Sequence, residues 1–220
     1  SRGFSKYYAT GNHPISCNQE RNCERHAGCI LRGMNDWTFD LQPTLTSELM
    51  TLRPLVPQDF EALFSVAADP LIWEQHPSAD RWQRPVFEIF FEEAIVSRGA
   101  FAVIDQQNDR IMGSTRFQPV PESKNAVEIG WTFLARAYWG GRYNHAMKSL
   151  MLDHAFRFVD NALFYIGGTN WRSQRAVEKL GARVITELDG ITLNPRDANA
   201  CIFRLPREEW KKSQPQANSI

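Results

Sequence analysis

Residues 137–150 read AYWGGRYNHAMKSL and mark the passage from a strand into a long helix. Gly140 and Gly141 are followed by an arginine, and no acidic residue occurs between Trp131 and Leu152. The N–H groups at a helix start and the positive end of the helix dipole favour an anion such as phosphate. The stretch fits neither the P-loop nor the three-glycine dinucleotide fingerprint. A plain corner, with glycines for steric ease, is the alternative interpretation.

The charges near this corner indicate binding of phosphate and not its cleavage. Arg142 stands at the helix start, and Lys148 follows one to two turns later. No Asp, Ser or Thr near the corner is arranged to hold Mg²⁺, which phosphoryl transfer requires.

The periodicity of apolar residues predicts the elements around the corner. In order they are a strand, two helices, three antiparallel strands, a helix, a strand, a helix and two strands. This order predicts an α/β (α+β) protein with a single mixed, mostly antiparallel central sheet and helices on both faces. The expected ranges are Glu48–Leu55, Gln58–Ala68, Val86–Ser97, Ala100–Asp105, Arg110–Pro119, Ala126–Leu134, Arg142–Val159, Leu163–Gly167, Asn170–Leu180, Arg183–Glu187 and Ala200–Leu205.

Bulk properties narrow the function classes. The 220 residues suffice for one sizeable core, and 25 Lys plus Arg balance 25 Asp plus Glu. This balance argues against a dedicated nucleic-acid binder. No apolar run has the length of a membrane span and no signal-peptide layout is present, so we expect a cytoplasmic protein without a membrane partner. The sequence leaves the oligomeric state open, with a homodimer as one candidate.

The N-terminal segment differs from the rest. Residues 1–33 are polar and without periodicity, whereas apolar residues become regular after Met34. We expect 1–33 to be a leader, vector-derived or disordered extension and 34–220 to be the functional domain. The alternative is an arm that docks on the domain or on a neighbouring subunit. Five residues separate each of Cys17, Cys23 and Cys29 from the next, which is not the ligand spacing of structural zinc, so we predict no metal site.

Three motifs in order resemble one enzyme family. They are Val127–Phe133 (VEIGWTF), Tyr138–Asn144 (YWGGRYN) and Asn170–Ala182 (NWRSQRAVEKLGA). From about Leu41 to Leu205 the chain resembles the GNAT superfamily of acetyl-CoA-dependent N-acetyltransferases, in the branch similar to the RimJ/RimL enzymes. The resemblance implies the GNAT fold, acetyl-CoA or CoA as cosubstrate, and no metal.

The resemblance also implies the residues that hold CoA. The family's pyrophosphate loop reads Gln/Arg-x-x-Gly-x-Gly/Ala, and here Arg142 and Asn144 replace both later small residues, while Gly141 comes one position early. The loop would bind through backbone N–H groups, Phe133 and Leu134 would bind the pantetheine and acetyl groups through theirs, and Asn170 would bind the pantetheine arm. A bulge before the corner would leave such donors unpaired. The implied binding residues are Phe133, Leu134, Trp139, Gly140, Gly141, Arg142, Tyr143, Asn144 and Asn170.

Glu128 is the first candidate for the catalytic base. On a regular strand it shares one face with Gly130 and Thr132, whereas Val127, Ile129, Trp131 and Phe133 share the other. A carboxylate on a central strand is costly to bury without a purpose or a partner. The resemblance places it near the acceptor amine. A structural ion pair with Arg116 on the adjacent strand is the alternative.

Ser173 is the second catalytic candidate, since the resemblance places it near the sulfur as proton donor or orienter. Asn170 is also an ideal N-cap, with Ser173 at the third helical position, so a structural role is open for both. Tyr138, Tyr143 and Tyr165 are rivals for the acid, while we expect Cys201 to be core packing, and His145 and His154 to be packed or solvated.

These observations predict direct transfer of acetyl from acetyl-CoA to a primary amine in a ternary complex. A peptide or protein N-terminus is the favoured acceptor, and a small amine is the second choice. Trp73, His76 and Trp82, with Arg81 and Arg84, are expected near the acceptor mouth. The alternative function is a CoA-binding sensor or assembly module without catalysis, because the phosphate loop departs from its pattern.

Overall fold

The computed structural model describes residues 39–193, 195 and 199–214. They belong to one compact unit, Trp37–Ile220. The predicted extension 1–33, with its three cysteines, lies outside the described residues. No helix within the described ranges has the length and apolar character needed to cross a membrane.

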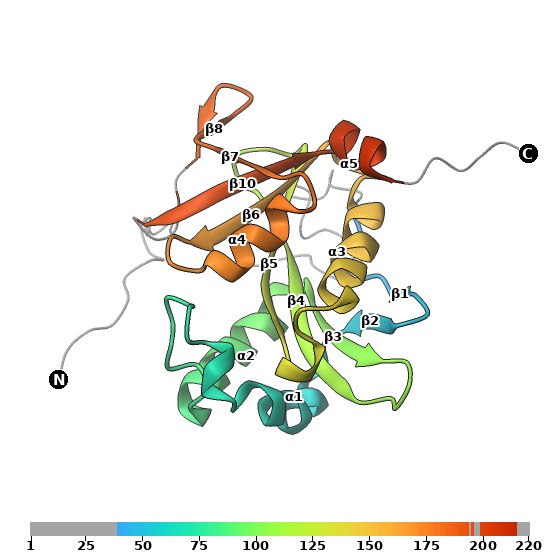
Figure 1. Ribbon diagram of the computed structural model, residues 1–220, viewed down its shortest axis with the longest axis vertical. Helices are drawn as coiled ribbons and strands as arrows, with labels where there is room; N and C mark the ends of the chain where they lie inside the picture. The colour runs from blue at the N-terminus through green and yellow to red at the C-terminus, as the bar shows by residue number, and fades with distance from the viewer. Residues whose placement is uncertain (1–38, 194, 196–198, 215–220) are drawn as a thin grey trace, which may run out of the picture. The chain divides into compact units, whose positions relative to one another are not determined.

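The described residues form an eight-stranded sheet in the order β1-β2-β3-β4-β5-β6-β10-β7 (Figure 1). β5 and β6 form the parallel pair and every other neighbouring pair is antiparallel, which confirms the predicted mixed, mostly antiparallel sheet. The strands are β1 (Leu45–Thr46), β2 (Met50–Pro54), β3 (Ala100–Asp105), β4 (Ile111–Pro119), β5 (Ala126–Leu134), β6 (Asn161–Gly167), β7 (Arg183–Ile185) and β10 (Ala200–Pro206). β8 (Glu187–Leu188) and β9 (Ile191–Thr192) form a separate hairpin.

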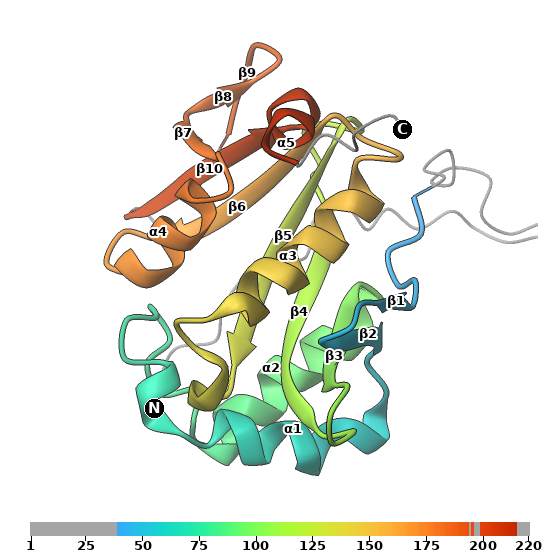
Figure 2. The same cartoon turned by 45° about the vertical axis from the view of Figure 1, so that its right-hand side comes forward.

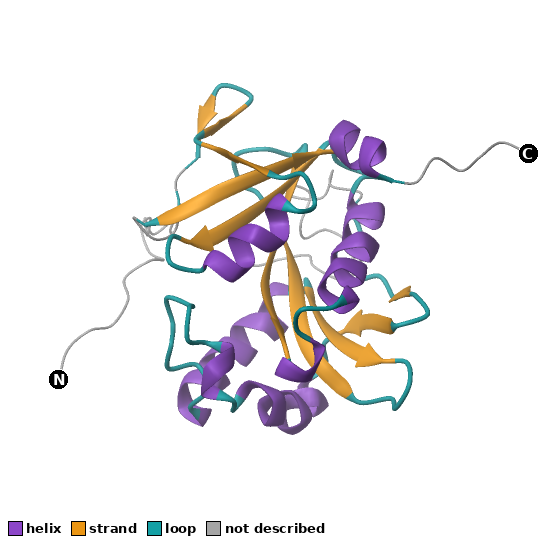
Figure 3. Ribbon diagram, viewed as in Figure 1, coloured by secondary structure: helices purple, strands orange, loops and turns teal. Residues whose placement is uncertain are grey.

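Helices lie on both faces of the sheet. Figure 2 shows α3 crossing one face of the central strands, with α1 and α2 on the other side. The same division of helices and strands is visible by colour in Figure 3. The helices are α1 (Phe60–Ala67), α2 (Arg84–Ser97), α3 (Arg142–Ala155), α4 (Trp171–Glu178) and α5 (Arg207–Ser213).

Two apolar layers hold the helices on the sheet. On the α3 face, Met147 and Met151 pack with Phe117 and Ile129. On the α1 and α2 face an aromatic cluster dominates, in which Phe87 contacts Phe60, Phe64, Phe90, Phe91 and Phe133. Buried aromatic pairs add stabilisation beyond the area that they remove from water. The sheet is therefore fixed on both sides next to β5.

Most predicted elements are present, and the differences have local causes. α3 ends at Ala155 and not at Val159, and Gly181 closes α4 with φ +97°, as a left-handed cap requires. β1 has two residues and so carries too little pattern to be predicted. α5 (REEWKKS) was missed because Trp210 is its single large apolar residue, which gives no helical period.

The strict alternation predicted for β5 is wrong beyond Gly130. Gly130 pairs with Arg116 and Phe133 pairs with Ser114, so Trp131 and Thr132 lie opposite the single residue between them. This is a β-bulge, and Trp131 has φ +51°. The extra residue reverses the faces. Val127, Ile129 and Leu134 pack on the α3 face, whereas Trp131 and Phe133 pack on the α1 and α2 face.

Candidate active site

The central feature of the site is a gap between two neighbouring strands. β5 pairs with β6 only over Ala126–Glu128, opposite Asn161–Leu163. Beyond Glu128 the strands separate, and β5 continues to Leu134 paired with β4 alone. A cavity of about 870 Å³ occupies this gap and is lined by the whole segment from Glu128 to Leu134. Its size is typical of a site for a small molecule or cofactor.

The cavity is closed on the α2 side by the loop that runs from Trp73 to Arg81. The N–H of Arg172, in the first turn of α4, donates to Gln75 Oε1 at 3.3 Å. Pro77 lies so close to β6 that a Cβ on Gly167 would be 2.7 Å from its ring. This loop therefore lies against the start of α4 and the end of β6.

The glycine corner forms a second side of the cavity. Gly141 is the N-cap of α3 and no side chain caps the helix, so its first N–H groups are not bonded by a capping residue. Gly140 has φ +68°, and a Cβ placed on it would meet nothing within 4 Å. Backbone conformation thus requires the first glycine, while neighbouring atoms leave space for a ligand to approach. Trp139 braces the corner by donating from Nε1 to the Leu134 carbonyl at 2.9 Å.

The start of α4 lies on the opposite side of the gap. Here Asn170 Oδ1 accepts from the Ser173 N–H at 3.2 Å, which is an ordinary N-cap. Both residues also line the cavity, so the capping role is compatible with a role in ligand binding. The Arg172 guanidinium lies 3.9 Å from the centroid of the Trp139 ring and joins the two helix starts across the cavity.

Glu128 is buried at the apex of the gap. Its side chain is 2% exposed, and its Oε1 lies 3.1 Å from the position that a Cβ on Gly130 would occupy. The missing side chain at Gly130 therefore leaves room for the carboxylate. Arg116, the proposed alternative partner, pairs with Gly130, so it is a diagonal neighbour of Glu128 on the adjacent strand. Its guanidinium stacks 4.4 Å from the Trp131 ring centroid.

The structure distinguishes the tyrosines that compete for the acid role. Tyr138 O–H donates to Asp105 Oδ2 at 2.8 Å, and burial, helped by that carboxylate, raises the pKa of this phenol. Tyr143 packs edge-on against Tyr138 and is not among the lining residues. Tyr138 and, on β6, Tyr165 line the cavity.

Lys148 occupies a position that its spacing did not reveal. The sequence predicted only that it adds positive charge near the corner, but it is 5% exposed and lies on the α3 side of the gap. Its Nζ donates to Thr132 Oγ1 on β5 at 2.6 Å and lies 5.9 Å from the centroid of the Phe164 ring on β6. Burial lowers the pKa of this ammonium to about 7. The spacing in the sequence could have indicated this position. Lys148 lies four residues after the N-terminal turn of α3, so it shares the helix face that points to the gap.

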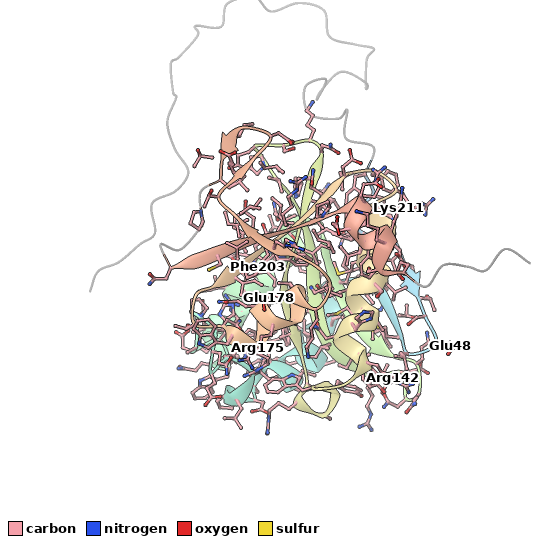
Figure 4. All side chains as sticks on the ribbon, turned by 45° about the horizontal axis from the view of Figure 1, so that its top comes forward. Glu48, Arg142, Arg175, Glu178, Phe203 and Lys211 are labelled. Carbon is pink, nitrogen blue, oxygen red and sulfur yellow. The ribbon has the colours of Figure 1, made fainter. Side chains whose placement is uncertain are left out.

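The other predicted residues divide into those that line the cavity and those that lie elsewhere. Arg142 is exposed and its side chain points outward from the start of α3 (Figure 4). His154 is buried and donates from Nε2 to the Asp40 carbonyl, 2.8 Å away, whereas His145 is exposed on α3 and lines the cavity. Cys201 is half-buried beside the α3-face core. The predicted catalytic and binding residues that line the cavity are Glu128, Phe133, Leu134, Trp139, Gly140, Gly141, Asn144, Asn170 and Ser173.

Trp73, His76 and Arg81 line the cavity, whereas Trp82 and Arg84 do not. Charge in the lining is strongly unequal. Glu128 is its carboxylate, and its Arg and Lys side chains are Arg81, Lys148, Arg172, Arg175 and Lys179. Among the described residues, no group of three or more His, Cys, Asp or Glu side chains could hold a metal ion. The lining thus suits a negatively charged ligand.

The sequence model of the acetyltransferase (GNAT) domain matches residues 50–183. The chain belongs to the GNAT acetyltransferase family. This GNAT protein is therefore an acyltransferase of a family whose members use acetyl-CoA, and the open glycine corner, the uncapped α3 start and the unpaired edge of β5 fit that donor. No curated protein sequence matches the chain.

Solved structures share the fold of this GNAT protein. A probable acetyltransferase from Chromobacterium violaceum has a TM-score of 0.67 at 19% identity, covering 87% of this chain and 100% of that chain. A putative acetyltransferase from T. thermophilus has a TM-score of 0.58 at 25% identity, covering 77% and 92%. The spermidine N-acetyltransferase from Vibrio cholerae, solved with CoA and spermine, has a TM-score of 0.53 at 16% identity, covering 75% and 99%.

Proposed function

We propose that this protein transfers an acetyl group from acetyl-CoA directly to a primary amine in a ternary complex. The observation that carries the proposal is the gap beyond Glu128, which brings the glycine corner, the α4 start and one buried carboxylate into a single cavity. A peptide or protein N-terminus, as in the RimJ/RimL-like branch, is the acceptor that the sequence resemblance favours. A small amine is the second choice.

The donor would lie along the unpaired edge of β5. In this arrangement the N–H groups at the start of α3 bind the pyrophosphate, and the cations Arg172, Arg175 and Lys179 of the α4 region supply further positive charge. Asn170 and the backbone of Phe133 and Leu134 bind the pantetheine and acyl groups. Donors fixed before the reaction stabilise the developing oxyanion without reorganisation.

Glu128 would act as the general base. The acceptor arrives as an ammonium and must lose a proton before its nitrogen can attack the thioester carbon. Glu128 takes that proton, directly or through a water. The nitrogen attacks and the new C–N bond forms. As the C–S bond breaks, the nitrogen loses its second proton to the hydroxyl of Ser173, or of Tyr165, whose side-chain type has the better-matched pKa, and that hydroxyl gives its own proton to the thiolate.

Thiol release from acetyl-CoA by the full chain tests the proposal. The acceptor panel contains N-terminal peptides, lysine peptides, polyamines and aminoglycosides, with a direct measurement of CoA binding beside it. We expect release with an amine class and none without an acceptor. CoA binding with no release for any acceptor would instead favour a CoA-binding module without catalysis.

A further inference from the structure

Arg81 lines the cavity and packs its guanidinium against two aromatic rings. Its guanidinium lies 4.5 Å from the centroid of the Phe90 ring and 5.2 Å from that of Trp73. Both rings pack against Phe133 of β5, at 6.1 Å and 5.0 Å between centroids. One aromatic layer therefore separates this cation from the bulged strand, on the side where an acceptor would meet the donor.

The stacked guanidinium retains hydrogen-bonding capacity. A guanidinium has five N–H donors, and its described polar contacts are Ser78 Oγ at 3.3 Å and His76 Nε2 at 3.4 Å. None of the ion pairs found between described residues includes Arg81. Glu93 and Asp80 act on it only at longer range, and burial outweighs them, lowering the pKa of Arg81 to about 10.

His76 places a second donor beside Arg81. The Ser78 N–H donates to His76 Nδ1 at 2.9 Å, so Nδ1 carries the lone pair and the proton of the neutral ring is on Nε2. Burial, and then the charge of Arg81, lower the pKa of His76 to about 4, so the ring is neutral at physiological pH. The 3.4 Å contact therefore joins two donors, which need a common acceptor.

The geometry points to an acceptor subsite: we propose that Arg81 and His76 bind a carboxylate of the substrate, so that the enzyme selects an amine that also carries an acidic group. This inference rests on the proposed transfer to an amine. The carboxylate would come from a small amino acid-like molecule or from an acidic N-terminal residue of a peptide. A polyamine would face Arg81 with no acidic partner in the lining other than Glu128.

Matched acceptors test this subsite. The ω-amino acids glycine, β-alanine, 4-aminobutyrate and 6-aminohexanoate are compared with their carboxamides, which keep the shape and remove the charge. Peptides that begin with Asp or Glu are compared with those that begin with Asn or Gln, and these two arms distinguish the two sources. We expect at least one acid to exceed its amide in kcat/KM by about tenfold or more.

Arg81→Met tests the residue itself, since Met keeps the apolar stem and loses the charge. We expect it to raise KM for the acid by about tenfold, with kcat and the amide little changed. Arg84→Met is the matched control, because Arg84 belongs to the same region, pairs with Glu61 and does not line the cavity. His76→Phe is expected to reduce the preference for the acid by a smaller factor.

Binding separates this inference from the proposed function. Calorimetry with CoA-loaded protein compares each N-acetylated acid with its N-acetylated amide, independently of turnover. Tighter binding of the acid, lost in Arg81→Met, supports the subsite even when no acceptor releases thiol. Equal kcat/KM for acids and amides, or equal loss of both in Arg81→Met, overturns the subsite while leaving acetyl transfer standing.

Discussion

The two ends of β5 belong to one continuous strand but differ in the number of strands that pair with them. Val127 and Glu128 pair with β4 on one side and β6 on the other, whereas Ile129, Gly130, Phe133 and Leu134 pair with β4 alone. A strand in the centre of the sheet thus becomes an edge halfway along its length. An edge presents unpaired backbone groups, which bind another chain or a ligand. The difference shows that the site is made by the loss of one strand partner, and the bulge at Trp131 follows three residues after the last pair with β6.

Glu128→Gln tests the boundary between the halves and has the largest expected effect. The amide keeps the size of the side chain but cannot accept the acceptor's proton. We expect kcat to fall about 100- to 1000-fold, equivalent to about 3–4 kcal/mol, with CoA affinity preserved. Thiol release and CoA titration measure the two quantities.

Glu122→Gln is the control for this variant, since Glu122 is an exposed acid in the turn before β5. A variant at Glu128 that retains its rate would remove the carboxylate from the mechanism and favour a structural role beside Arg116.

Lys148→Met tests the buried side chain that contacts the part of β5 beyond its pairing with β6. Burial lowers the folded-state pKa of Lys148 to about 7, from an ordinary 10.5, so between these values the unfolded chain binds more protons. Stability of the parent therefore rises with pH across this window, and this rise disappears in the variant. We expect Lys148→Met to be more stable, with a gain about 2 kcal/mol larger at pH 6 than at pH 9.

Thermal unfolding at the two pH values measures this gain, and Thr132 keeps Thr115 Oγ1 as a hydrogen-bond partner at 2.8 Å in the variant. Lys211→Met, on exposed α5, is the control. A pH-independent change would show that Lys148 is charged and stabilised in the folded state.

Gly130→Ala tests whether the space next to Glu128 matters. The new Cβ would lie 3.1 Å from Glu128 Oε1, so the carboxylate must shift by a few tenths of an ångström. We expect about a tenfold loss of kcat, since small displacements of a base are costly, with little change in CoA affinity or melting temperature. Unchanged turnover would mean that the carboxylate position is not critical.

Asn170→Ala tests the far side of the gap and has the smallest expected effect. Loss of the cap on the Ser173 N–H should lower the free energy of unfolding by about 1 kcal/mol, or 2–4 °C in melting temperature. A weaker CoA affinity in addition would support its pantetheine role, whereas loss of stability alone would restrict it to capping.

Much of the fold was predictable because its elements carry strong local signals. β3 and β5 have the predicted bounds, and the glycine after α4 adopts the left-handed conformation that caps require. The position of the Trp131 bulge was not predictable in detail, since a register shift depends on the partner strand β4. This is why the face of Trp131 and Phe133 was assigned wrongly.

In the candidate site, too, some residues were predictable from motifs and others only from tertiary contacts. The motifs located Glu128, the glycine corner and Asn170, all of which line the cavity. Arg142, which has the most visible charge in the corner, points outward instead (Figure 4). Arg81 and His76 came from turn-rich sequence without a motif, and only the contacts with Trp73, Phe90 and Ser78 give them a common direction. The RimJ/RimL-like branch and the N-terminal extension remain predictions.

The sequence by itself determined the family, the order of the main strands and helices, and the helix start with open N–H groups, because these follow from local spacing and backbone preference. Tertiary structure decided where β5 loses β6, how Lys148 becomes buried under Thr132, and which cations meet in the cavity. These features depend on residues far apart in the chain. Whether a side chain is buried, or a strand is paired, depends on the segments packed against it, so no single segment of sequence specifies either property.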